Sequence, residues 1–335
     1  MNARLSAYRS QIGLLSISVE YYASSFPRLP DWCRNLVQKT FIKEALTQML
    51  IFYAAYPSMC MGFGCNACGV TGCRIIDSPR ERLIAILTNT FAPCNGRFPL
   101  LIFLCAVFFT DSAAGGALLL TAVIASSVVL TLAASRLLSA TVLKGAPSSF
   151  TLELPPYRAP QIGQVIVRSV FDRTLFVLGR AAAVAAPAGA LIWLLANLDI
   201  GGISVFSHLT ALLDPAGRLF GLDGVILLAF ILAFPANELV MPLIVMGYLA
   251  TGSIADVADL AAFRTLLLAN GWTVCTALCT LVFSVAHWPC STTCLTIWKE
   301  TRSIKWTLAA FALPTAFGLA LCLAVHGVCT LIGLI

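Results

Sequence analysis

Charged side chains are scarce in this sequence. Its 335 residues include 21 lysines and arginines and 15 aspartates and glutamates, so that 11% are charged, 59% are hydrophobic and the mean hydropathy is +0.91. A water-soluble protein uses about 25% charged residues to cover its surface. The scarcity excludes a soluble enzyme, a nucleic-acid-binding protein and a secreted disulfide scaffold, and it places the chain in a lipid bilayer.

Several segments contain no acidic or basic residue at all. Residues 112–135, 265–298 and 306–335 are each longer than the roughly 20 residues that span a hydrocarbon core. The first 44 residues differ, because basic residues alternate there with apolar runs too short to span. We therefore expect transmembrane helices after a cytoplasmic or interfacial lead-in at 1–44.

The basic residues predict which side of the membrane each loop faces, since lysine and arginine mark cytoplasmic loops. Residues 136–174 are basic and rich in proline, and we interpret them as a cytoplasmic connector between membrane repeats at 45–135 and 175–335. A second basic cluster lies at 299–305. It stays cytoplasmic if either 224–250 or 265–287 forms a re-entrant hairpin instead of crossing once.

Helix-breaking motifs recur in both halves. Phe63-Gly64-Cys65-Asn66 and Pro93-Cys94-Asn95 in the first half correspond to Phe234-Pro235-Ala236-Asn237 and Pro289-Cys290-Ser291 in the second. Paired interrupted helices at corresponding positions are the best sequence indication of a transporter's binding site at the membrane midplane. The pattern predicts an all-α, polytopic helical membrane protein with two gate repeats that contain broken or re-entrant helices.

The side chains at these breaks are suited to a transition-metal cation. Glu238 is the only charged residue between Asp223 and Asp256, and an ionisable residue in such a stretch indicates function. Thiolate and imidazole ligands favour ferrous iron or zinc over magnesium or calcium. The candidate metal-contacting residues are Cys65, Asn66, Cys94, Asn237, Glu238, His287, Cys290 and Cys294.

The thirteen cysteines do not form a disulfide framework, since their number is odd and most lie in apolar stretches. Cys65 and Cys68 form a C-x-x-C pair without the nearby second pair of a closed zinc site. Small cysteines also let membrane helices pack closely. We assign only such packing to six of them: Cys33, Cys105, Cys275, Cys279, Cys322 and Cys329.

Five motifs in the same order resemble the membrane part of the FeoB family of bacterial ferrous iron transporters. They are GFGCN at 62–66, PCNGRFP at 93–99, LELPPYR at 152–158, FPANE at 234–238 and HWPCSTTC at 287–294. The resemblance covers about residues 45–335. It implies a permease for Fe²⁺ in the bacterial inner membrane, with the ion as cargo. One departure is Cys68, where the family usually has proline.

The family's nucleotide-binding motifs are missing from this sequence. There is no G-x-x-x-x-G-K-[ST] and no N-K-x-D. We therefore expect no nucleotide site and no enzyme activity in this chain, so that GTP hydrolysis would require a separate GTP-binding protein. The other expected partners are lipid, ferrous iron, a small Feo-type accessory protein and a second copy of the chain, but no nucleic acid.

Two alternatives stay open at the level of the sequence. The chain is a gate-domain transporter of another substrate, either a nucleoside-type molecule or a different divalent metal. Alternatively, it is a truncated or split remnant that transports nothing itself and assembles with a GTPase-bearing transporter.

Overall fold

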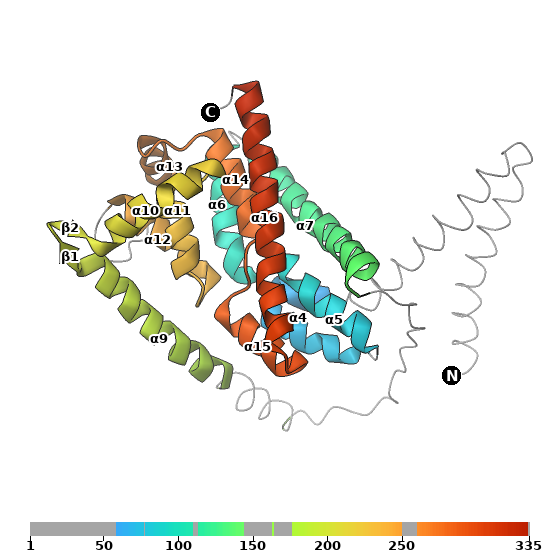
Figure 1. The fold of residues 1–335 in the computed structure, drawn as a ribbon. Coiled ribbons are helices and arrows are strands. Elements are labelled where there is room, and N and C mark those ends of the chain that lie inside the picture. Colours follow the sequence, from blue (N-terminus) through green and yellow to red (C-terminus); the bar gives the residue numbers. More distant parts are fainter. Residues whose placement is uncertain are drawn as a thin grey trace, which may run out of the picture. The chain divides into compact units, whose positions relative to one another are not determined.

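The computed structural model describes residues 58–76, 78–109, 113–143, 163, 176–249 and 260–333, and nearly all of them are helical (Figure 1). The expected lead-in at 1–44 and most of the connector at 136–174 lie outside the described residues. The prediction of an all-α, polytopic membrane fold with broken helices is confirmed.

Three segments are long and apolar enough to cross a membrane. They are Pro79–Phe108 with 30 residues, Gly115–Thr141 with 27 and Ile304–Ile332 with 29. The first consists of α5 (Pro79–Thr88), the 3₁₀ turns η3 (Asn89–Phe91) and η4 (Asn95–Arg97), and α6 (Phe98–Phe108). The other two are α7 (Ala113–Thr141) and α16 (Ile304–Ile332). At a rise of about 1.5 Å per residue, α7 and α16, with 29 residues each, exceed the roughly 30 Å of a hydrocarbon core.

Two further apolar helix pairs are sharply bent. The first pair, α10 (Val205–Leu219) and α11 (Gly224–Leu232), turns by 108°, and the second, α13 (Leu260–Ala269) and α14 (Val274–Val285), turns by 107°. Each pair is a broken span or a re-entrant loop by length and composition. Residues 224–250 and 265–287 are the two segments in which the charge pattern allowed a re-entrant hairpin. The first contains the break between α11 and η6, and the second contains the bend between α13 and α14.

The two bends are built alike from the sequence. Gly221 and Gly271 have φ angles of +69° and +79°, a left-handed conformation that glycine adopts without steric strain. Two residues later a polar side chain caps the next helix, since Asp223 and Thr273 each accept a backbone N–H three residues further on. Before the first bend, α9 (Phe176–Asn197) leads into α10 through the hairpin of β1 (Asp199–Ile200) and β2 (Ile203–Ser204).

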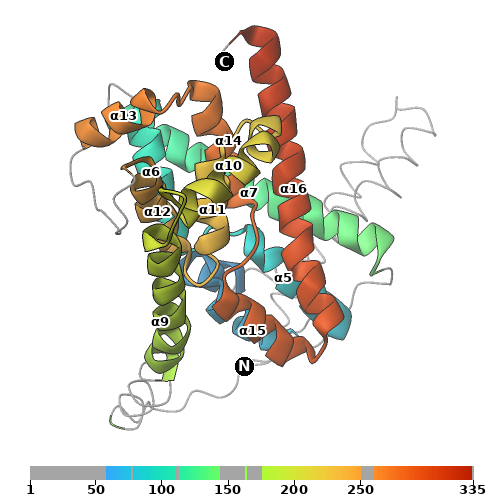
Figure 2. The same cartoon turned by 60° about the vertical axis from the view of Figure 1, so that its left-hand side comes forward.

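The helix α16 packs along α14 in both views (Figure 1) (Figure 2). The thiol of Cys322 donates to the Cys279 carbonyl over 3.3 Å. Gly318 lies so close to the Ala286 carbonyl that an added Cβ would come within 2.0 Å of its oxygen. The glycine thus lets the two backbones approach closely, as small residues do between membrane helices.

The apolar core contains five of the six cysteines expected only to pack. Cys105, Cys275, Cys279, Cys322 and Cys329 are buried in one hydrophobic cluster with α6, α11, α12 (Val240–Leu249) and α14 residues. The sixth, Cys33, lies outside the described residues. Pro242 lies in the first turn of α12, where its missing N–H removes no helical hydrogen bond, so it does not interrupt the helix.

All four predicted break motifs interrupt helices. The helices or turns that begin after them are α4 (Asn66–Gly72, followed by η2, Cys73–Ile75), η4, η6 (Asn237–Leu239) and α15 (Ser291–Thr301). Each begins after one extended residue. Cys65 and Ala236 share a φ of −151° with ψ of 122° and 117°, whereas Cys94 and Cys290 have ψ of 166° and 161°. The backbone thus follows the same pairing as the sequence motifs.

Candidate functional site

Residues from the two halves of the chain meet where η4 lies against η6. Asn237 donates its side-chain amide to the sulfur of Cys94 over 3.7 Å, and both residues are buried. Gly96 lies at the same junction, where an added Cβ would make an ordinary contact of 3.5 Å with the Glu238 backbone nitrogen. The structure therefore brings together the second break of the first half and the first break of the second half.

The two breaks of the second half are joined by hydrogen bonds. The backbone nitrogen of Ser291 donates to the Phe234 carbonyl over 2.8 Å, and its hydroxyl donates to the Pro235 carbonyl over 3.4 Å. Cys290 and Cys294, at the start of α15, are partly buried and lie within electrostatic range of each other. A carbonyl freed by the broken helix is thus satisfied by the start of α15.

The first break presents one exposed thiol and one buried amide. Cys65 is exposed at the start of α4, within electrostatic range of the Cys94 thiol. Asn66 is buried, and with its amide nitrogen turned toward the neighbouring carbonyls it donates to Gly62 over 3.0 Å and to Ala92 over 3.1 Å. Asn66 therefore holds the first break to the second through the backbone.

The remaining two predicted site residues have different surroundings. His287 is 1% exposed, and its Nδ1 lies 3.1 Å and 2.9 Å from the carbonyl oxygens of Phe283 and Ser284. Its ring contacts the Phe230 ring with centroids 4.9 Å apart, so the histidine belongs to an aromatic cluster. Glu238 is exposed at the edge of the η4–η6 junction.

The thiols do not form a closed metal cage. Within the part of the chain that the structure describes, no three histidine, cysteine, aspartate or glutamate side chains are grouped so as to hold a metal ion. The site residues instead lie in neighbouring pairs: Cys65 with Cys94, Cys94 with Asn237, and Cys290 with Cys294. Chemically, the arrangement offers soft sulfur ligands beside backbone and side-chain oxygens.

Two family models match adjacent stretches of this chain. Residues 120–172 match the model described as "Ferrous iron transport protein B C terminus", and residues 178–304 match the Gate model, described as "Nucleoside recognition". The sequence is 30% identical over 257 residues to a protein named Fe(2+) transporter FeoB from Synechocystis, which covers 76% of this chain and 40% of that protein. This chain is a relative of the membrane portion of FeoB.

Other FeoB proteins have a similar sequence identity to this chain. One from Staphylococcus aureus is 28% identical over 260 residues, covering 76% of this chain and 38% of that protein. One from Salmonella typhimurium is 30% identical over 160 residues, which cover 48% of this chain and 19% of that protein. The chain thus spans about 40% of the length of the first of these FeoB relatives. No solved structure matches.

Sequence reasoning missed two buried polar residues of the FeoB-related breaks. Asn89 donates its amide to the Asn66 carbonyl over 3.0 Å, and Arg97 is 1% exposed beside the Cys94 turn. Arg97 carried a signal in the sequence, because it is the only charged residue between Arg82 and Asp111. An ionisable residue in an apolar stretch indicates a functional position, as it did for Glu238.

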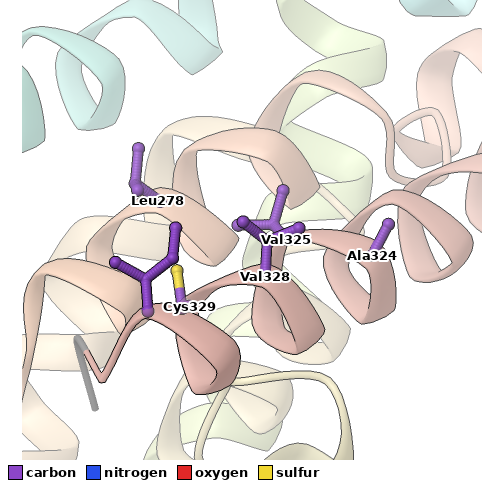
Figure 3. A pocket seen from close by; sticks show the side chains of 6 residues that line it. Leu278, Ala324, Val325, Val328 and Cys329 are labelled. Carbon is purple, nitrogen blue, oxygen red and sulfur yellow. The ribbon is translucent and has the colours of Figure 1, made fainter.

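A pocket of about 360 Å³ lies elsewhere in the FeoB-related fold, between α14 and the end of α16 (Figure 3). Its lining is apolar apart from one thiol: Leu278, Ala324, Val325, Val328, Cys329 and Ile332. No predicted site residue lines this pocket. The pocket therefore offers a cation no ligand set comparable to that of the breaks.

Proposed function

We propose that this chain is the permease portion of a ferrous iron transporter of the bacterial inner membrane, through which Fe²⁺ passes between two gate repeats. The observation that carries the proposal is the junction of Cys94 with Asn237, which joins one broken segment of each half. Transporters bind their cargo at such paired breaks, where unwound backbone and side chains replace the ion's hydration shell.

The donor set suits ferrous iron. Cysteine sulfur prefers soft and borderline metals, whereas magnesium and calcium prefer an all-oxygen shell. Ligands spread along a path, rather than closed into a cage, also suit a cargo that must leave again. Fe²⁺ therefore fits the thiols of the breaks better than a hard divalent cation does.

The eight predicted site residues divide into two groups in this proposal. Six of them contact the passing ion: Cys65, Cys94, Asn237, Glu238, Cys290 and Cys294. The other two keep the breaks in shape, since Asn66 is engaged with backbone carbonyls and His287 Nδ1 faces two more. Asn66 and His287 are thus assigned a positioning role in place of direct ligation.

We further propose the domain organisation in which residues 45–135 form the first gate repeat and residues 175–335 form the second gate repeat with the C-terminal helices. The matching backbone angles at Cys65 and Ala236, and at Cys94 and Cys290, support this pairing. Residues 1–44 and 136–174 would then be the cytoplasmic lead-in and connector. Proteolysis of inside-out vesicles within 136–174 tests that placement.

Control by nucleotide would come from outside the sequence at hand. The FeoB relatives extend well beyond the region that this chain matches, and the chain itself contains no phosphate-binding loop. We propose that a GTP-binding protein, with or without a small Feo-type accessory protein or a second copy of the chain, regulates iron flux. Pull-down of partners from native membranes, with and without GTP, tests this.

A nucleoside-type cargo is the second candidate, favoured by the description of the Gate model. Against it, Trp288 stacks on Phe311 with ring centroids 5.6 Å apart and lies edge-on to Phe283, so its ring is already occupied. That leaves Trp288, the tryptophan that directly precedes the fourth break motif, unavailable to stack on a base.

One pair of measurements separates the two cargoes. The purified protein is reconstituted anaerobically, and uptake of Fe²⁺, Zn²⁺ and Mg²⁺ is compared with calorimetric binding of nucleosides. We expect Fe²⁺ uptake above that of empty liposomes, little Mg²⁺ uptake and no nucleoside heat. Nucleoside binding without metal uptake would replace the iron proposal with the second candidate, and neither activity would favour a non-transporting remnant.

A further inference from the structure

Arg97 is the largest fully buried side chain in the described part of the chain. It lies in η4, three residues after Cys94 and inside a segment long and apolar enough to cross a membrane. A buried guanidinium is far less favourable than a hydrophobic side chain of similar volume unless most of its donors are engaged. Both NH₂ groups of Arg97 have partners, whereas its Nε–H has none. The stability of Arg97 at this depth therefore depends on the groups to which it donates.

The guanidinium donates to four backbone carbonyl oxygens. One is that of Thr90, at 3.1 Å, and the other three belong to Val285, His287 and Trp288, at 2.8, 3.4 and 3.3 Å. The last three lie at the end of α14 and in the unwound stretch before α15. Unwinding leaves such carbonyls without helical partners, and a hydrogen-bond donor must replace them at membrane depth.

These hydrogen bonds connect the two proposed ligand positions of the P-C motifs. Arg97 follows Cys94 by three residues, and Trp288 precedes Cys290 by two. Both thiols also lie within electrostatic range of the guanidinium. The Arg97 guanidinium is planar and rigid, and it is hydrogen-bonded to the backbone before Cys94 and to the backbone before Cys290. It can therefore set the distance between the two cysteines.

We infer that Arg97 is a positioning residue, which holds the unwound backbone at 285–288 against the η4 turn and thereby sets the separation of the Cys94 and Cys290 thiols. The inference rests on the proposed function, because it assigns those thiols to the ion path. It adds a residue that does not itself touch the ion. Lysine would keep the positive charge but not the planar guanidinium, since one ammonium group cannot replace two NH₂ groups that donate in fixed directions.

The test compares Arg97→Lys and Arg97→Met with wild type and with the control Arg74→Lys. Arg74 is the control because its exposed side chain pairs with Glu300 of α15 and it lies outside the four break motifs. Co²⁺ serves as the spectroscopic probe, since thiolate ligation gives it an intense near-ultraviolet band. Hydrogen exchange of the amides at 285–290 reports the backbone without any metal, and thermal unfolding reports the fold.

We expect both Arg97 variants to remain folded, to exchange at 285–290 about tenfold faster and to bind Co²⁺ about tenfold more weakly, as loss of charged hydrogen bonds predicts. Arg74→Lys should match wild type in both measurements. Unchanged exchange and Co²⁺ affinity in a folded Arg97 variant would overturn the inference. Loss of the fold in both variants would do so too, because Arg97 would then serve the fold as a whole.

The two proposals fail in different ways in this experiment. If wild-type protein itself gives no cobalt–thiolate band, the proposed ion path is wrong, while the exchange comparison still measures whether Arg97 holds residues 285–290. If wild type binds Co²⁺ and the Arg97 variants do so equally well, the ion path stands and the positioning role is wrong.

Discussion

Asn237 and Cys94 lie 143 residues apart in the sequence, and the amide of the first donates to the sulfur of the second over 3.7 Å. This contact links the two halves of the chain at the point where each is unwound. The sulfur accepts one hydrogen bond in this contact, which does not use all of its lone pairs. The proposed passage of Fe²⁺ between the two gate repeats depends on this junction.

Replacement of the amide tests the junction. Asn237→Leu keeps the size of the side chain but removes the donor to Cys94, and one hydrogen bond is worth about 1 kcal/mol. We expect the KM for Fe²⁺ uptake to rise about fivefold. The control Asn270→Leu removes an amide that donates only to the Leu266 carbonyl at the exposed end of α13. Equal KM values in the two variants would show that the junction plays no part in binding.

Two glycines of α16 test how closely this helix packs against Ala286, just before the break at Pro289-Cys290-Ser291. An added Cβ at Gly318 would come 2.0 Å from the Ala286 carbonyl oxygen, whereas Gly327 has no neighbouring atom within 4 Å. Gly318→Ala should destabilise the protein by about 1 to 3 kcal/mol through overpacking. Gly327→Ala should stabilise it by up to about 1 kcal/mol, because alanine favours the helix.

Thermal unfolding in detergent measures both glycine variants under one condition. A lowered melting temperature for Gly318→Ala together with an unchanged or raised one for Gly327→Ala is the expected pattern. The reverse order would mean that α16 does not approach the fourth break as closely as described.

The two bent helix pairs are joined by one tyrosine. Tyr248 donates to the Asp223 carboxylate at the first bend and accepts from Trp272 Nε1, over 2.6 Å, at the second. Tyr248→Phe removes the acceptor of Trp272 Nε1 and one of the donors to the Asp223 carboxylate, so we expect a loss of about 1 to 3 kcal/mol in stability. A double-mutant cycle with Trp272→Phe should give a coupling energy of about 0.5 kcal/mol or more. Strict additivity of the two substitutions would contradict a shared network.

The sequence carried most of the information about where helices break. Phe234 to Asn237 contains a proline in an apolar run, and the structure interrupts the helix there. Pro242 lies in the same apolar run but does not interrupt a helix, because a proline in the first turn has no helical hydrogen bond to lose. Position within the helix, which depends on where the preceding break ends, decides which of two nearby prolines is disruptive.

The grouping of site residues was harder to foresee. Cys94 and Asn237 are recognisable as break residues, but their contact depends on the fold, which brings together segments 143 residues apart. His287 has the chemistry of a ligand, yet backbone carbonyls and aromatic rings surround it. Arg97 was not singled out as a site residue, although it is the only charged residue between Arg82 and Asp111, because its contact with the Val285 carbonyl depends on the fold.

The most direct test of the ion path is anaerobic uptake of Fe²⁺ into proteoliposomes that contain wild-type protein, Cys94→Ser or the control Cys60→Ser. The account predicts that Cys94→Ser lowers the initial rate at least about tenfold, because oxygen replaces a soft ligand. Cys60→Ser, which alters an exposed thiol outside the four breaks, should keep the wild-type rate. Uptake by Cys94→Ser at the wild-type rate would contradict the account.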